Sequence, residues 1–497
     1  MKQRATIKIN FRGGIISPGD LFNILVAAAK AGIYYVSFGL RQQLLIDVPS
    51  ETVRVLTDEL KKLDIHFEPD KDDFPNIVSS YAAEEAFIHN TWLSEGVYKD
   101  IFDNIDYQPR LKINISDSNQ SFTPMLTGNV NWVASASDQH FWHLFIRFPK
   151  TNVIYEWNQM VYTNDVAKLS KEIETIIFEY KDEFYDNVAS SGESLFQKIS
   201  IEKFITKQAE KPAVLPAFNL PYYEGLNRYN NKYWLGIYRR DELFSINFLK
   251  DLCLLCLETK VGQLCSTPWK SVMVKGIEEK DKLKWNRLLE KHQVNMRHAA
   301  NELNFQVEEH SHDALQLKQY LVKELNNEDT RTFGLCIGIK TRRKSEVFSS
   351  ILVRRKPLLR IFGLEMFFLY DILCAHDFNP NERTGFAFSR NNPKFLIAEQ
   401  LRQAVSAFYN HRASKTVVSD KKVIPRKEKD IKPAKVYVHQ CIHCLTVYDV
   451  RTGETEKDIA AGTAFESLPD DYSCPLCEGP KNDFVKIAEA ELGLQAI

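Results

Sequence analysis

Cys441-Ile442-His443-Cys444 and Cys474-Pro475-Leu476-Cys477 are the two stretches around which the chain is organised. Each stretch places two cysteines three positions apart, and 29 residues separate Cys444 from Cys474. Two such pairs supply four thiolates to one tetrahedral metal site, which suits iron as well as zinc. The spacing therefore predicts one small metal-binding module near the C-terminus, and it leaves the metal open.

Size and composition place this module on a much larger body. The chain has 497 residues, which is too long for one core and predicts three or four domains. A net charge of −1 gives no case for nucleic-acid binding. The most apolar run, residues 357–375, is interrupted by charged residues, which argues against a membrane span. Five cysteines lie outside the two pairs, and no secretory signal is evident, so we expect free thiols and a reducing cytoplasm.

Hydrophobic periodicity predicts a duplicated body of the α+β class. Residues 5–63 read as a strand, a helix that begins near Ser17-Pro18, two short strands and a second helix. Residues 233–290 repeat this order of elements. The chain is therefore expected to contain a divergent duplication with a spacing of about 230 residues.

Short motifs in the body resemble the sirohaem nitrite and sulfite reductases. Residues 13–21 (GGIISPGDL) and 37–42 (SFGLRQ) are similar to the first ferredoxin-like half-domain of that family, and residues 264–270 (LCSTPWK) to the second. Residues 109–113 (PRLKI) resemble a family strand whose cations hold the substrate anion. The resemblance covers roughly residues 1–410. It implies a first ferredoxin-like half-domain at 1–85, a reductase-like α+β domain at 86–210, a second half-domain at 211–305 and a second α+β domain at 306–410.

The cysteine pattern of the body departs from this family. Sirohaem reductases hold a four-iron cluster on four cysteines in the second α+β domain, and one of these thiolates also ligates the sirohaem iron. After Asn304 and before the metal module, this chain offers only Cys336 and Cys374, and neither has a partner at the family spacing. A four-iron cluster is therefore not expected, and its loss argues against sirohaem as well.

Cations in the body suggest a retained anion pocket. Arg41, Arg110 and Lys112 stand in the resembling motifs, and guanidinium and ammonium groups are suited to a carboxylate-rich tetrapyrrole or an oxyanion. Residues 340–355 form a second basic region with the same potential. The alternative is that these side chains are ordinary solvated cations on strand edges. No catalytic residue is assigned.

From Val436 to about Ala490 the chain resembles rubredoxin along the whole module. Residues 461–465 (AGTAF) and 468–472 (LPDDY) match characteristic runs of that family, and the aromatic residues Tyr437, Tyr448, Phe465, Tyr472 and Phe484 are expected to form its core. A basic segment at 411–435 would tether the rubredoxin domain (436–490) to the body as a flexible linker. The resemblance implies one iron per chain on Cys441, Cys444, Cys474 and Cys477. A structural zinc ribbon is the alternative.

Two positions next to the cysteine pairs depart from the rubredoxin pattern. The family usually has glycine after each pair, where a positive φ is needed. Leu445 and Glu478 occupy these positions here. We expect a shifted reduction potential and altered hydrogen bonds to sulfur, with the metal retained.

Together these features predict a cytoplasmic electron-transfer protein, more a carrier than a complete reductase. Its rubredoxin would exchange single electrons with redox partner proteins, a donor and an acceptor, in nitrite or sulfite reduction; no nucleic acid or membrane is implied. One alternative is a tetrapyrrole-binding oxyanion reductase that uses the rubredoxin as its electron inlet. Another is a non-catalytic adaptor of a separate, complete reductase.

Overall fold

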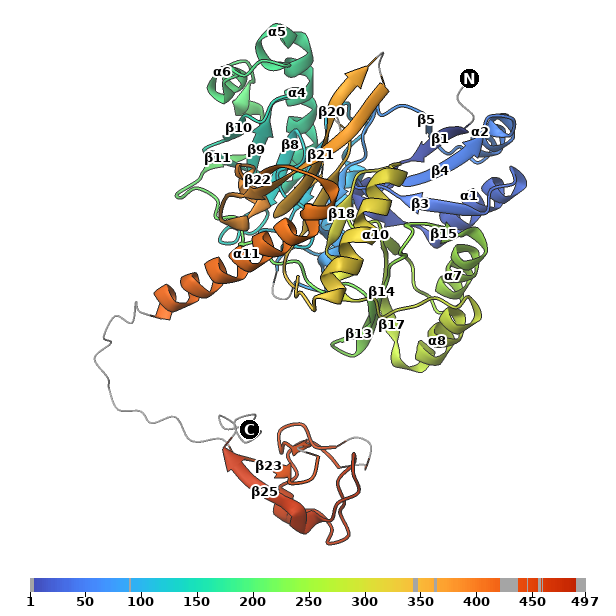
Figure 1. The fold of residues 1–497 in the computed structure, drawn as a ribbon, viewed down its shortest axis with the longest axis vertical. Coiled ribbons are helices and arrows are strands. Elements are labelled where there is room, and N and C mark those ends of the chain that lie inside the picture. Colours follow the sequence, from blue (N-terminus) through green and yellow to red (C-terminus); the bar gives the residue numbers. More distant parts are fainter. Residues whose placement is uncertain are drawn as a thin grey trace. The chain divides into compact units, whose positions relative to one another are not determined.

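A computed structural model describes residues 4–88, 91–342, 347–361, 364–420, 437–444, 446–454, 457 and 459–488. The chain divides into two units, Met1–Val417 and Val418–Ile497. Most of the secondary structure belongs to the first unit, whose four sheets are seen in Figure 1. Mixed helices and sheets in separate segments confirm the predicted α+β class.

Two five-stranded sheets form the duplicated part of the body. The first has the order β15-β3-β4-β1-β5 and the second the order β13-β14-β17-β16-β2. The strands of the first sheet are β15 (Phe244–Ser245), β3 (Tyr35–Phe38), β4 (Leu44–Pro49), β1 (Arg4–Ile9) and β5 (Glu68–Pro69). The strands of the second sheet are β13 (Gly225–Tyr229), β14 (Lys232–Ile237), β17 (Val272–Glu278), β16 (Leu264–Ser266) and β2 (Ile15–Ile16).

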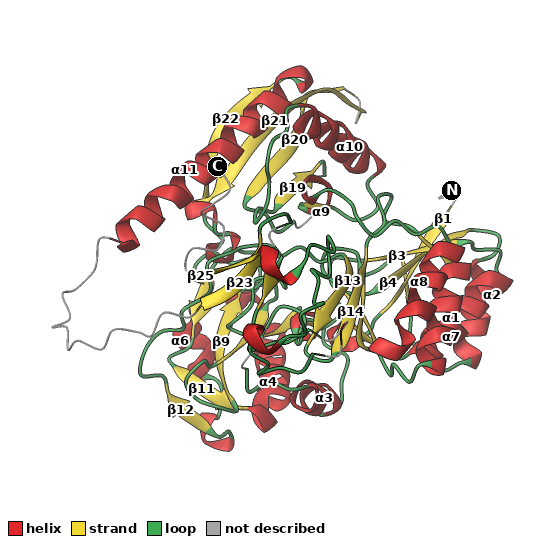
Figure 2. Ribbon diagram, turned by 90° about the horizontal axis from the view of Figure 1, so that it is seen from below, coloured by secondary structure: helices red, strands yellow, loops and turns green. Residues whose placement is uncertain are grey.

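The two sheets exchange strands and share one layer of helices. Strand β2 of the first half pairs with β16 of the second, and β15 of the second half pairs with β3 of the first. Four helices gather on one side of the sheets (Figure 2): α1 (Pro18–Lys30), α2 (Val53–Lys62), α7 (Ile246–Glu258) and α8 (Lys282–Lys291). Apolar residues of both halves therefore form a single core.

Local sequence explains where α1 begins and ends. Ser17 is its N-cap and accepts a hydrogen bond from the Asp20 N–H at 3.3 Å, while Pro18 occupies the first helical turn. Gly32, with φ of 77°, follows the helix. The predicted start of this helix is thus confirmed. Leu21, Ile24 and Leu25 point into the shared core.

Two further sheets, one of seven strands and one of five, complete the body and share one strand pattern. The first contains β12 (Thr206–Gln208), β11 (Gln159–Tyr162), β9 (Phe141–Arg147), β8 (Val130–Ala134), β7 (Ile113–Ser116) and β6 (Val78–Ser79) in that order, and β10 (Ile154–Glu156) pairs with β9. The second contains β18 (Phe305–Val307), β19 (Ile337–Lys340), β20 (Ile351–Ile361), β21 (Leu364–Ala375) and β22 (Gly385–Asn392). In each sheet three parallel strands, β6-β7-β8 or β18-β19-β20, are followed by an antiparallel fourth.

Helices cover one face of each of these two further sheets. Helices α3 (Glu95–Asp103) and α4 (Val166–Glu179) pack on the first, and α10 (His312–Asn327) and α11 (Ile397–Asp420) pack on the second. Shorter helices are α5 (Lys181–Phe184), α6 (Gly192–Gln197) and α9 (Ala300–Leu303). The 3-10 turns of the body are Arg12–Gly14, Tyr81–Ala83, Thr163–Asp165, Ile201–Lys203, Glu279–Asp281, His376–Phe378, Pro380–Glu382 and Lys394–Leu396. Residues 411–420 of the predicted linker continue α11, and residues 421–435 lie outside the described residues.

The second unit contains a three-stranded antiparallel sheet. Its order is β24 (Val447–Tyr448), β23 (Tyr437–Cys441) and β25 (Phe484–Ala488), and 3-10 turns occur at Phe465–Ser467 and Lys481–Asp483. Among the described residues of the whole chain, no helix has the length and apolar character that a membrane span requires.

Candidate metal centre and basic cleft

Two similar loops in the second unit carry the four cysteines. Strand β23 ends at Cys441, and the Cys441 N–H donates to the Thr446 carbonyl at 2.9 Å, which closes the first loop. In the second loop the Cys474 N–H donates to the Gly479 carbonyl at 2.7 Å. These matched hydrogen bonds turn both loops so that their sulfurs face a common point.

The four sulfur atoms converge as a tetrahedral metal site requires. All lie within 4.8 Å of one another, with Sγ–Sγ distances of 3.6 Å for Cys441 and Cys477 and 3.4 Å for Cys444 and Cys474. A disulfide would bring two sulfurs to about 2.05 Å, whereas four sulfurs about 2.3 Å from one metal lie nearly 4 Å apart. The donor set and its geometry therefore fit a single metal ion.

Hydrogen bonds to the sulfurs differ between the two loops. The hydroxyl and then the backbone N–H of Thr446 lower the pKa of Cys444, and the two atoms Cys444 Sγ and Thr446 Oγ1 are 3.1 Å apart. In the second loop the N–H of Gly479 lowers the pKa of Cys477, but hydrogen bonds shared with the other cysteines raise it overall. Metal binding requires thiolates, so the donors of Thr446 favour the form of Cys444 that binds a metal ion.

An aromatic core supports the metal site. Tyr448, Phe465, Tyr472 and Phe484 are buried together, as the sequence predicted. Tyr437 is 47% exposed, which corrects its expected place in this core. Tyr437 is the first residue of β23, and the core begins only with the next residue of that strand. His439, which the sequence reasoning missed, stacks on Phe465 with ring centroids 4.1 Å apart.

Glu478 and Leu445 stand where rubredoxins usually have glycine, and Glu478 is among the described residues. Glu478 has φ of 61°, so the left-handed conformation that favours glycine is present at this position. Its N–H donates to the Cys474 carbonyl at 2.9 Å and keeps the second loop closed. Leu445 lies outside the described residues.

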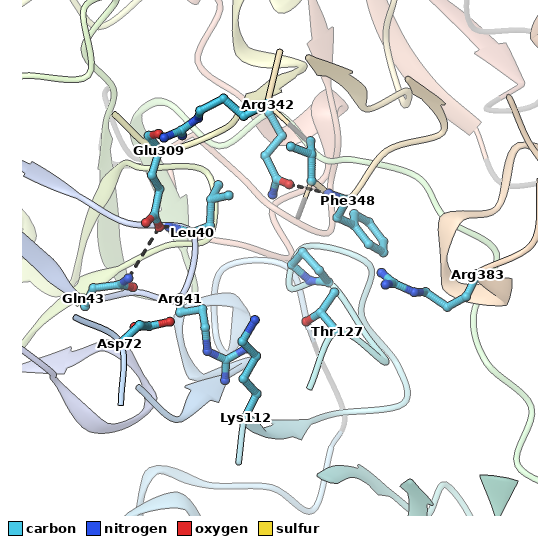
Figure 3. A pocket seen from close by; sticks show the side chains of 13 residues that line it. Leu40, Arg41, Gln43, Asp72, Lys112, Thr127, Glu309, Arg342, Phe348 and Arg383 are labelled. Carbon is cyan, nitrogen blue, oxygen red and sulfur yellow. Dashed lines mark hydrogen bonds between the residues drawn. The ribbon is translucent and has the colours of Figure 1, made fainter. Parts of the chain in front are cut away.

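In the body, two of the three predicted anion-binding cations line one cavity. Arg41 and Lys112 line a cavity of about 240 Å³ together with Thr127, Arg342 and Arg383 (Figure 3). Asp72 and Glu309 are its acidic lining residues. The cavity thus combines cations from segments far apart in the sequence.

Buried hydrogen bonds hold the loop that carries Arg41. The Gln42 side chain is fully buried; its Nε2 donates to the carbonyls of Ser79 at 3.2 Å and Ser266 at 3.0 Å, and its Oε1 accepts from the Ser79 N–H at 2.9 Å. Gly14 lies against Gln42 so closely that a Cβ would come within 2.7 Å of Nε2. Arg41 itself donates through Nη2 to the Asn76 carbonyl at 2.7 Å and the Ile113 carbonyl at 3.0 Å.

Arg110 lies elsewhere. Its guanidinium is 4.1 Å from the ring centroid of Phe178, and its backbone N–H donates to Glu174 at 2.7 Å. It is absent from the lining of the cavity. Arg110 and Lys112 are two positions apart, so their side chains would share one face of an extended strand. Arg110, however, lies in a bend before β7, so strand alternation does not apply to it.

A wider cleft of about 1080 Å³ shares Val347, Phe348 and Arg383 with the first cavity. Among its described lining residues, one is acidic, Asp186, and six are cationic. The cationic residues are Arg147, Lys150, Lys340, Arg354, Arg383 and Arg390. Lys340 and Arg354 come from the basic region expected at 340–355, whereas Arg355 pairs with Asp313 at 2.9 Å. Arg343 and Lys344 lie outside the described residues.

Sequence reasoning missed four of the cleft cations: Arg147, Lys150, Arg383 and Arg390. Arg147 carried a weak signal, because it ends β9 on the same face as the polar His143. Arg383 carried none, because it follows a 3-10 turn and has a left-handed φ of 57°. Only the fold brings these segments to one cleft.

Thiols of the body provide no second metal centre among the described residues. The four cysteines of the second unit are the one group there of three or more metal-ligating side chains. Cys336 is fully buried and lies 3.1 Å from the Phe348 carbonyl, and burial raises its pKa. Cys374 lines the cleft, but burial raises its pKa to about 12. Neither thiol is poised to bind iron.

Comparison with known proteins assigns the second unit. The rubredoxin family model matches residues 438–484. Rubredoxin-2 of Chlorobaculum tepidum is 50% identical over 48 residues, which are 10% of this chain and 92% of that protein. Through this domain the chain belongs to the rubredoxin family. Rubredoxin-1 of the same organism is 48% identical over 46 residues, or 9% of this chain and 67% of that protein. The rubredoxin domain is therefore arranged for a single iron on Cys441, Cys444, Cys474 and Cys477.

The body is similar in fold to a solved structure. The NirA protein of Mycobacterium tuberculosis matches with a TM-score of 0.59 over 82% of this chain and 81% of that chain. Sequence identity is 13%, so the likeness concerns the fold alone. It confirms the fold that the sequence resemblance predicted for the body.

Proposed function

We propose that this chain is an electron carrier whose rubredoxin site exchanges single electrons with redox partner proteins in nitrite or sulfite reduction. The convergence of the four sulfurs carries this proposal. Iron bound there would change between its ferric and ferrous forms. The loop hydrogen bonds at Cys441 and Cys474 hold the sulfurs in one arrangement, so little rearrangement accompanies each electron.

Exposure of one ligand gives electrons a route to a partner. Cys477 is exposed, while Cys441 and Cys474 are buried. Leu476 and Ile442, next to the ligands, are 73% and 53% exposed. A partner that covers these side chains would bring its own redox centre near the sulfur of Cys477. Free thiols throughout the chain agree with a reducing cytoplasm.

Metal content and the visible spectrum of the purified chain test the proposal. We expect one iron per chain and a sulfur-to-iron charge-transfer spectrum that bleaches reversibly on reduction. Cys444→Ser should lose both. Cys253→Ala is the matched control, because Cys253 is a thiol buried in the body core and far from the ligand set in sequence. Zinc without iron, and no redox activity after iron reconstitution, would refute electron transfer.

The role in nitrite or sulfite reduction rests on the fold of the body. The body lacks the cysteines that would hold a four-iron cluster. Among the described residues, the ligands for a redox metal are therefore those of the rubredoxin site. The carrier would therefore serve a reductase rather than perform the multi-electron reaction itself. Pull-down of a sirohaem reductase from native extract, and faster sulfite or nitrite reduction on adding the iron-loaded chain, are the expected results.

A second candidate function is supported by the cleft of the body. An anionic tetrapyrrole is a ligand of suitable charge, because cations outnumber acidic residues in the lining of both the cavity and the wider cleft of about 1080 Å³. Lys112→Ala should weaken binding of a polycarboxylate porphyrin about tenfold, since a charge-assisted contact is lost. Arg110→Ala is the matched control and should leave affinity unchanged. Equal affinities for all three proteins would remove this candidate.

A further inference from the structure

We propose that the Thr446 hydroxyl donates a second hydrogen bond to the sulfur of Cys444 and thereby raises the reduction potential of the iron. This inference rests on the proposed electron-carrier function. It assigns a positioning role to a residue that is not a ligand. The Oγ1–Sγ distance of 3.1 Å carries it.

The direction of the hydrogen bond follows from the chemistry of the ligand. Either atom could donate in the metal-free protein. A cysteine that binds iron has lost its proton and can only accept. The hydroxyl of Thr446 is then the donor, and it joins the backbone N–H of the same residue at Cys444.

The second loop provides an internal comparison. Thr446 and Gly479 each lie two positions after the second cysteine of their loop, and each accepts the N–H of the first cysteine through its carbonyl. Each also directs its own N–H at the preceding cysteine sulfur. Gly479 has no side chain, so at this matched position among the described residues the hydroxyl donor is found in the first loop. The two halves of this site are therefore similar in backbone and different in donor number.

Reduction strengthens this additional bond. One electron converts ferric to ferrous iron, no proton moves, and all four sulfurs remain thiolates. The added negative charge is shared with the sulfurs, and a hydrogen bond strengthens when its acceptor becomes more negative. The bond consequently stabilises the reduced site more than the oxidised one. Thr446 is partly buried and its backbone carbonyl is held by Cys441, so the hydroxyl stays near its acceptor.

Three variants of the full-length chain test the inference. Thr446→Val has nearly the same shape and no hydroxyl, whereas Thr446→Ser keeps the hydroxyl. Thr452→Val is the control: its hydroxyl donates to the Asp449 carbonyl at 3.1 Å, in a turn without metal ligands. The midpoint potential is measured by mediated titration, followed through the charge-transfer absorption. Iron content of each protein is measured alongside.

For Thr446→Val we expect a three- to tenfold smaller equilibrium constant for reduction, which is about 30–60 mV at 59 mV per tenfold. The charge-transfer bands should shift as well, because the sulfur loses a donor. Thr446→Ser and Thr452→Val should stay close to the wild type. A full iron load with an unchanged potential in Thr446→Val, or an equal fall in Thr446→Ser, would overturn the inference alone. Absence of a reversible iron couple in the wild type would overturn the proposed function with it.

Discussion

Replacing Gln42 with alanine should destabilise the body strongly, because this side chain joins three segments of the fold. Gln42 is fully buried, and its amide makes hydrogen bonds of 3.2, 3.0 and 2.9 Å to backbone groups of Ser79 and Ser266. Ser266 lies in the second half of the duplicated part. Alanine leaves these buried groups without their partner.

The magnitude follows from the number of bonds. A buried group that loses its partner costs about 1–3 kcal/mol, so three lost bonds predict a fall of about 3–9 kcal/mol in the free energy of unfolding. The lower half of this range is expected, because the Thr123 hydroxyl still donates to the Ser79 carbonyl at 3.4 Å. Gln43→Ala is a closely matched control. Gln43 is 3% exposed, but its Nε2 reaches Glu309 only at 3.5 Å and its Oε1 has no partner, so at most about 1 kcal/mol should be lost.

Urea unfolding followed by tryptophan fluorescence measures this difference. All seven tryptophans lie between Trp92 and Trp285, within the body, so the rubredoxin domain does not contribute to the signal. Arg41, next in the chain, should lose its fixed position, and porphyrin affinity should fall in Gln42→Ala even below the unfolding transition. Equal destabilisation by Gln42→Ala and Gln43→Ala would refute the reasoning.

Three further predictions concern pH, metal and backbone strain. Burial lowers the pKa of Lys318 to about 8, so between pH 7.5 and 9.5 the unfolded chain binds more protons at this residue than the folded chain does. The free energy of unfolding should therefore rise by about 2 kcal/mol between these two pH values. Urea unfolding at both pH values measures the rise, and Lys318→Met should lose it. Removing the metal with a chelator should unfold residues 437–488 while tryptophan fluorescence stays constant, since so small a core depends on its metal; protection of this domain from protease in the apo chain would contradict it. Glu478→Gly should stabilise the iron-loaded domain by about 1 kcal/mol, because glycine adopts φ of 61° without strain, and a lower thermal midpoint for release of the iron would argue against it.

The rubredoxin domain was largely predictable because its site is local. Each cysteine pair lies within four residues, so the spacing itself determines the loop, and only one long-range meeting of the two loops is needed. Tyr437 shows the limit: aromatic character predicts a core position, but exposure depends on where the strand begins.

The cleft was only partly predictable because its lining is assembled by tertiary structure. Arg41 and Lys112 were found through motifs, and the structure places both in one cavity. Arg110 stands two positions from Lys112 and still lies over the ring of Phe178, since it is part of a bend before β7 and not of the strand. Arg383 follows a turn with no periodicity and reaches the cleft only through the fold.

The strand exchange between the two halves has a consequence for synthesis on the ribosome. Strand β2 contains Ile16, and its partner in β16 is Leu264, which is made 248 residues later. At 5–20 residues per second the ribosome needs about 12–50 seconds to deliver that partner. Throughout this interval the first half carries an unpaired edge and an incomplete apolar core. Nascent chains shorter than about 300 residues should therefore be clients of chaperones that shield strand edges.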